Sequence, residues 1–128
     1  MQVCLRVENV SKNTTLGENI KIADSSLRRM VGLLGTPHLA PQSGLLIFPT
    51  QGVHTFGMKY PIDVVFVNRK RQVVGINAAL KPWRLSRIYW SAECVVELPE
   101  GVVEATRTEV GDQLAWGEAG QGSHSNAG

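Results

Sequence analysis

Three residues that can carry a charge near neutral pH, His54, Lys59 and Asp63, lie close together in the segment HTFGMKYPID, residues 54–63. Asp63 is the most unusual of them, because it sits in an otherwise apolar run where an unpaired carboxylate is costly to bury. One interpretation pairs Asp63 with Lys59 or His54 in a recessed polar site able to exchange protons near neutral pH. The other makes Asp63 structural, bound by backbone N–H groups or by an arginine of residues 28–29. The residue types favour the structural interpretation.

A second candidate region is the irregular stretch 79–90, where Trp83 and Trp90 are interleaved with Arg84 and Arg87. Flat aromatic surface beside guanidinium groups can stack on bases, sugars or aromatic peptide side chains. The simpler interpretation is a loop whose large side chains anchor it over one end of a barrel. The ligand-binding candidates are, in chain order, His54, Thr55, Lys59, Asp63, Trp83 and Arg84.

Motifs of the familiar enzyme classes are missing from the sequence. No GxSxG elbow frames a serine, and no GxGxxG or P-loop offers a phosphate cradle. His38, His54 and His124 do not share the spacing of a metal site. The sequence therefore predicts no metal and no cofactor, and it favours a binding protein over an enzyme.

The composition indicates one globular domain with no dedicated polyanion partner. The 128 residues carry 43% hydrophobic residues and a formal charge of only +2. No apolar run approaches the roughly 18 residues of a membrane span, and the N-terminus does not resemble a secretory leader. Two cysteines, Cys4 and Cys94, do not make a disulfide framework. We therefore expect a cytoplasmic protein with reduced thiols and no membrane contact.

The pattern of apolar residues predicts a mainly β domain of α+β type, a curled sheet or small barrel of seven or eight short strands. One amphipathic helix is expected over residues 25–34, where apolar side chains recur at helical spacing after a capping aspartate. The domain should extend over residues 1–116, and residues 117–128, which lack large apolar side chains, should form a disordered tail. The expected strands are 1–7, 20–23, 44–48, 62–67, 72–76, 94–98, 108–110 and 113–116.

Two connections between these strands have recognisable local patterns. Residues 68–71 should form a hairpin connection between strands 62–67 and 72–76. Alternation in residues 54–59 predicts an extended backbone with His54, Phe56 and Met58 on one face.

The sequence resembles the DUF192 family through three motifs and their order. These are MVGLLG at 30–35, GLLIFP at 44–49 and HTFGMKYPIDVVF at 54–66, and the resemblance extends over roughly residues 25–116. It implies a compact β-rich fold in a widespread prokaryotic family without an established activity. Gly57 stands where relatives resembling exported proteins often carry tryptophan, so the chain is most similar to the HTFGM subgroup, which usually lacks a leader.

Three functional hypotheses follow from these residues. The first is a binding or accessory module that holds a small polar ligand or a peptide in a pocket around residues 54–63 and Trp83. The second is a small enzyme that uses Asp63 and His54 for proton transfer. The third, made weak by the charge balance, is nucleic-acid contact through basic residues 69–71 and the aromatic stretch.

Overall fold

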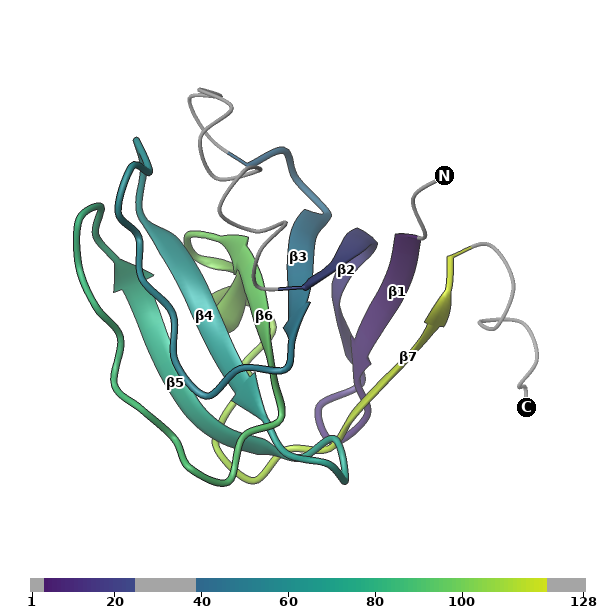
Figure 1. The fold of residues 1–128 in the computed structure, drawn as a ribbon. Helices are drawn as coiled ribbons and strands as arrows, with labels where there is room; N and C mark the ends of the chain where they lie inside the picture. The colour runs from purple at the N-terminus through teal and green to yellow at the C-terminus, as the bar shows by residue number, and fades with distance from the viewer. Residues whose placement is uncertain (1–3, 25–38, 120–128) are drawn as a thin grey trace.

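A single curled sheet forms the molecule in the computed structural model, which describes residues 4–24 and 39–119 (Figure 1). Seven strands in these ranges lie in the order β5-β4-β6-β3-β2-β1-β7 and curve into a half-barrel, with one short helix. The mainly β fold class is thereby confirmed. The elements are β1 (Cys4–Asn9), β2 (Thr14–Asp24), β3 (Ser43–Phe48), β4 (Ile62–Val67), β5 (Val73–Leu80), β6 (Cys94–Pro99), α2 (Val102–Ala105) and β7 (Leu114–Glu118).

Most neighbouring strands are antiparallel, and only β2 and β3 pair in parallel among the described strands. A parallel pair needs a crossover connection, which here must pass through residues 25–42. The helix expected over residues 25–34 falls in this crossover and lies outside the described residues. The hairpin expected at residues 68–71 is confirmed, because it joins the antiparallel pair β4 and β5.

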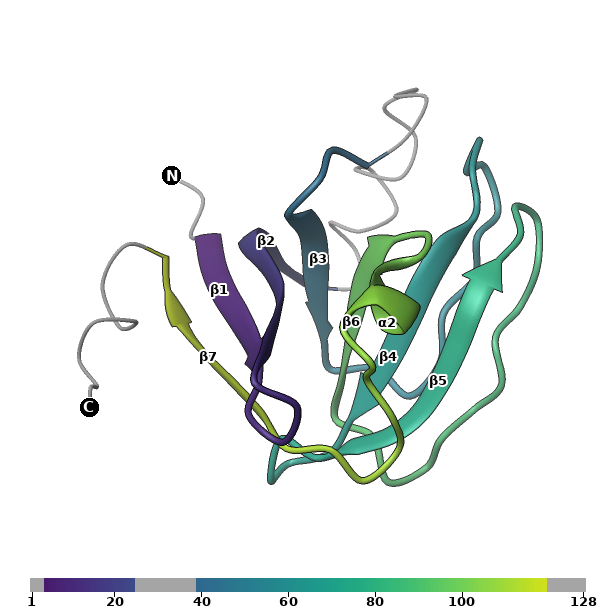
Figure 2. The same cartoon turned by 180° about the vertical axis from the view of Figure 1, so that it is seen from behind.

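Both faces of strand β4, which lies between β5 and β6, are buried, which explains its almost uninterrupted apolar sequence. Val65 and Val67 belong to a cluster that includes Val103 of α2, on the face seen in Figure 2. Val64 and Phe66 belong to a second cluster on the opposite face. Residues 49–61 and 81–93, two long connections, also contribute side chains to that second cluster. Alternation along β4 therefore places Val64 and Phe66 beneath these connections.

Several boundaries differ from the sequence-based expectations. β2 begins at Thr14, six residues before the expected strand 20–23. The additional residues are extended because they pair with β1 and, at Asn19, with β3. Residues 117–119, expected in the tail, continue along β1, and the rest of the tail lies outside the described residues. Residues 108–110 are not a strand, and the short helix α2 was not expected.

The extended alternation expected for residues 54–59 is wrong. After an isolated bridge at His54 the chain turns at Phe56 and Gly57, and Gly57 takes a positive φ of 85°. Met58 is therefore buried, whereas Phe56 is 43% exposed. The turn therefore separates Met58 from His54 and Phe56, whose rings remain stacked.

The strand β1 is tied to the chain before β7 by a buried polar network around Asp112. Its carboxylate accepts hydrogen bonds from Asn9 Nδ2 at 2.9 Å, from Lys12 Nζ at 2.8 Å and from the Glu109 N–H at 2.9 Å. Asn9 is fully buried and also donates to the Thr108 hydroxyl. Burial alone would raise the pKa of Asp112, but these hydrogen bonds and the charge of Lys12 outweigh it and lower the pKa below its usual value.

We expect Asp112 to make the protein sensitive to acid. Because its folded-state pKa is lowered, the stability it contributes is present above the unfolded pKa of about 3.9 and is lost as the pH falls through the folded pKa. Asp112→Asn should cost about 1 to 2 kcal/mol at neutral pH. Urea denaturation of both proteins from neutral to acidic pH should show their unfolding free energies converging in acid. A difference that stays constant with pH would contradict this role.

Two further features of the described residues bear on function. Cys4 and Cys94 are both free thiols, and burial raises the pKa of Cys94 to about 11. Cys94 is therefore protonated at neutral pH and is a poor nucleophile. In the same described ranges, no helix is long and apolar enough to cross a bilayer.

Candidate binding surface

Two long connections lie side by side and form a paired structure of their own. They are residues 49–61, between β3 and β4, and residues 81–93, between β5 and β6, and we call them the paired loops. His54 and Leu85 form an antiparallel bridge between them. Backbone hydrogen bonds of 2.9 to 3.0 Å connect Thr55 with Arg84 and Trp83, Val53 with Ser86, and Gln51 with Tyr89. This ladder joins the two loops through their backbones and satisfies polar groups that would otherwise lack partners.

Thr55 joins the two loops and is completely buried. Its hydroxyl donates to the Lys81 carbonyl at 2.6 Å and accepts from the Arg84 N–H at 2.8 Å. Trp83, with a positive φ of 62°, donates its N–H to the Thr55 carbonyl at 3.0 Å. Thr55 therefore positions Trp83 and Arg84, and its own hydroxyl faces the loop backbone.

Tyr89 anchors the second loop to the sheet. Its ring packs against Phe66 of β4 with the ring centroids 4.4 Å apart, and it covers Gly75 of β5. A Cβ atom at Gly75 would overlap the Tyr89 ring. The absence of a side chain at Gly75 is thus what lets Tyr89 reach the sheet.

Large apolar side chains project from the paired loops into solvent. We call the following five the apolar surface: Phe56 (43% exposed), Trp83 (64%), Leu85 (71%), Ile88 (55%) and Trp90 (76%). The rings of His54, Phe56 and Trp83 are stacked in a row, with centroid separations of 5.0 and 5.9 Å. A concentration of exposed apolar side chains on one region is typical of an interaction site.

Two surface hollows lie along the paired loops. The larger, of about 590 Å³, is lined by Pro49, Thr50, Gln51, Arg69, Trp90, Ser91, Ala92 and Glu93. The smaller, of about 410 Å³, is lined by Gln51, Gly52, Val53, His54, Leu85, Ser86, Ile88 and Trp90. Gln51 and Trp90 line both hollows, so the two are neighbours separated by these side chains.

Asp63 lines neither hollow, and both of its carboxylate oxygens accept hydrogen bonds. Oδ1 accepts the Ala79 N–H at 2.8 Å, and Oδ2 accepts the N–H groups of Gly101 at 3.1 Å and Val103 at 2.9 Å. Ala79 lies where β5 bulges opposite Asp63, and Val103 lies in α2. The carboxylate therefore joins the β5 bulge to the start of α2, and it is only 1% exposed.

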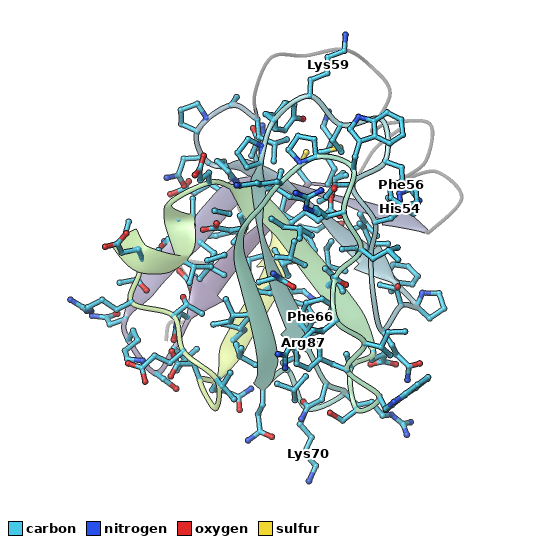
Figure 3. The ribbon with its side chains drawn as sticks, turned by 90° about the vertical axis from the view of Figure 1, so that its left-hand side faces the viewer. His54, Phe56, Lys59, Phe66, Lys70 and Arg87 are labelled. Atoms are coloured by element: carbon cyan, nitrogen blue, oxygen red, sulfur yellow. The ribbon has the colours of Figure 1, made fainter. Side chains whose placement is uncertain are left out.

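The structure brings together some of the predicted site residues and separates others. His54, Thr55, Trp83 and Arg84 all lie in the ladder of the paired loops. His54 Nδ1 also accepts the Phe56 N–H at 3.2 Å, and Figure 3 shows these two side chains close together. Lys59 is exposed and projects from one end of the molecule in the same view.

Residues that the sequence did not mark as candidates complete the surface. Phe56, Leu85 and Ile88 contribute exposed apolar area, and Gln51 lines both hollows. Leu85 and Ile88 belong to no recognisable motif. The only signal in the sequence that could indicate their exposure is their position in the irregular aromatic stretch 79–90. No group of three or more potential metal-ligating side chains occurs within residues 4–24 and 39–119.

The fold and this surface define a class of protein: a single curled β half-barrel that presents an apolar surface on two paired loops. Its solved structural neighbours include a protein of unknown function from Novosphingobium aromaticivorans, with a TM-score of 0.73, 20% identity, and coverage of 90% of this chain and 85% of that one. A protein from Sinorhizobium meliloti has a TM-score of 0.71 at 22% identity, covering 91% of this chain and 94% of that one. These likenesses show the fold.

Sequence comparison identifies the family. The DUF192 family model, described as "Uncharacterized ACR", matches residues 7–116. A UPF0127 protein from Pyrococcus furiosus is 34% identical over 114 residues, which cover 84% of this chain and 95% of the relative. A UPF0127 protein from Thermococcus sibiricus is 32% identical, with coverage of 84% and 72%. The chain belongs to the DUF192 family, as its three motifs indicated.

Proposed function

We propose that this protein is a binding module that holds a peptide segment of a partner protein on the paired loops. The observation that carries the proposal is Trp90, which is 76% exposed and lines both hollows. Its indole would contact a chain lying across both hollows. Exposed tryptophan side chains on a rigid support are typical of residues that dominate binding energy.

The support for Trp90 is rigid because the ladder and Tyr89 hold both loops to the sheet. A preformed surface loses little conformational entropy when it binds. The row of His54, Phe56 and Trp83 offers flat rings for stacking, and Leu85 and Ile88 offer aliphatic contact. These are the contacts that apolar peptide side chains make.

A peptide is favoured over a small polar ligand because the polar candidates do not converge. Asp63 uses both carboxylate oxygens on backbone N–H groups, and Lys59 projects from one end of the molecule. The same arrangement weakens the enzyme alternative, in which Asp63 and His54 transfer a proton. That mechanism needs both groups within reach of one substrate.

Trp90→Ala tests the proposal directly. We expect the substitution to weaken the binding of a peptide, selected from a random library on the full chain, by roughly tenfold or more. The reason is that a tryptophan in the middle of an interface is a typical hot spot. Stability should change by less than about 0.5 kcal/mol, because the side chain is exposed. Fluorescence anisotropy of a labelled peptide measures the affinity, and urea denaturation measures the stability.

Val110→Ala is the matched control. Val110 is 62% exposed but lies outside the paired loops, so its truncation should leave peptide affinity unchanged. If no peptide is enriched on the full chain over the Trp90→Ala variant, the proposed function is wrong.

A further inference from the structure

Charge is distributed unevenly along this nearly neutral chain. Residues 59–92 contain seven cations, namely Lys59, Arg69, Lys70, Arg71, Lys81, Arg84 and Arg87, and a single acid, Asp63. Residues 93–118 contain seven acids, namely Glu93, Glu97, Glu100, Glu104, Glu109, Asp112 and Glu118, and a single cation, Arg107. The overall charge of +2 conceals this separation.

The fold places three of these seven cations on or beside the apolar surface. Arg84 and Arg87 are exposed in the second paired loop, and Arg69 lines the larger hollow beside Trp90. Within the paired loops the only acid is Glu93, which lines the same hollow. The single acid nearby in sequence, Asp63, is buried and held by backbone N–H groups. In Figure 3, the helix α2, which carries Glu104, lies on the opposite side of the molecule from His54 and Phe56.

We propose that the recognised peptide is acidic, with carboxylates placed beside apolar side chains. This inference rests on the proposed function and specifies its partner. The Arg69 guanidinium would bind a carboxylate at the larger hollow while Trp90 contacts the neighbouring apolar side chain. Guanidinium groups bind carboxylates through paired, charge-assisted hydrogen bonds, and charge complementarity selects partners and speeds association.

Nucleic acid fits this surface less well than an acidic peptide does. Leu85 and Ile88 are 71% and 55% exposed, and aliphatic side chains offer little to a phosphate backbone. Arg71 is turned toward β7, where its guanidinium lies 4.2 Å from the Trp116 ring centroid and donates to the Trp116 carbonyl. A membrane surface is also a poorer match, because the apolar side chains border hollows that an extended chain can fill.

The test is selection of a random peptide library on the full chain, with the Trp90→Ala variant used to remove unspecific binders. We expect enriched peptides to contain an excess of Asp and Glu beside aromatic or aliphatic residues. Their affinity should fall as salt is raised, because exposed charges are screened. Arg69→Gln should weaken binding roughly tenfold, whereas Glu93→Gln, in the same hollow, should tighten it about threefold.

Lys21→Gln is the charge-matched control, because Lys21 is an exposed cation on β2 outside the paired loops; it should leave affinity unchanged. Enriched peptides that lack acidic residues, or whose affinity is unchanged by Arg69→Gln, would contradict the proposal that the partner is acidic. Such peptides would still support the peptide-binding function. Tighter, arginine-dependent binding of oligothymidylate or of phosphatidylglycerol vesicles would overturn the acidic peptide in favour of those partners. Enrichment of no peptide would refute both.

Discussion

Asp63→Asn is expected to lower the free energy of unfolding by about 2 to 4 kcal/mol. The substitution keeps the size of the side chain but replaces a carboxylate oxygen with an NH₂ group, which cannot accept the backbone N–H groups that Asp63 binds now. Hydrogen bonds to a charged group are worth about 1.5 to 3 kcal/mol, and a buried N–H left without a partner adds its own cost. Urea denaturation followed by circular dichroism measures the loss.

Glu104→Gln is the control for Asp63→Asn, since it removes an exposed carboxylate from α2 itself. Its effect should stay within a few tenths of a kcal/mol. Lys59→Ala should also be nearly neutral, because Lys59 is exposed. An unchanged or raised unfolding midpoint for Asp63→Asn would contradict the structural role and would instead support a role for Asp63 in a binding site.

Gly75→Ala is expected to cost about 1 to 3 kcal/mol, although alanine is ordinarily a better tolerated residue than glycine in a strand. The new methyl group would occupy the space of the Tyr89 ring and push it off Phe66. Because Tyr89 anchors the second paired loop, the same substitution should weaken peptide binding even though Gly75 is buried beneath it.

A double-mutant cycle separates this overlap from a general weakness of β5. Tyr89→Ala alone should cost about 2 to 4 kcal/mol, and adding Gly75→Ala to it should cost little more, because the overlap is gone. Gly117→Ala is the matched control: a Cβ there meets no atom within 4 Å, so stability should hardly change. Additive costs in the cycle would show that the Tyr89 ring is not what makes alanine unfavourable at position 75.

The fold could be predicted from local patterns to a large extent. β4, β6 and β3 are apolar runs bounded by Pro or Gly, and the expected strands 62–67, 94–98 and 44–48 match the observed ones closely. The early part of β2 was missed because Thr14 to Asn19 is mostly polar and is extended only by its pairing with β1 and, at Asn19, β3. Pairing between distant segments can override local preference in this way.

The candidate site could be predicted only in part. Asp63 was correctly singled out as a buried carboxylate, but the donors that satisfy it come from residues 16, 38 and 40 positions away in sequence. Trp83 and Arg84 were correctly placed in an irregular aromatic stretch. This stretch pairs with residues 49–61, and the pairing forms the hollows beside Trp90. Contacts between two irregular loops cannot be predicted from the periodicity of the sequence.

Motif spacing and apolar alternation are local properties of the chain, so they are sufficient to predict the family, the β-rich class and the residues whose side chains could do chemistry. The tertiary structure alone decided which of those residues share a surface. It buried Asp63 because the β5 bulge and the start of α2 bring backbone donors to its carboxylate. It left Trp90 in solvent on the paired loops, which Tyr89 attaches to the sheet at Phe66 and Gly75. Burial and exposure arise from contacts between distant segments, so two residues of equal chemical interest can receive opposite roles.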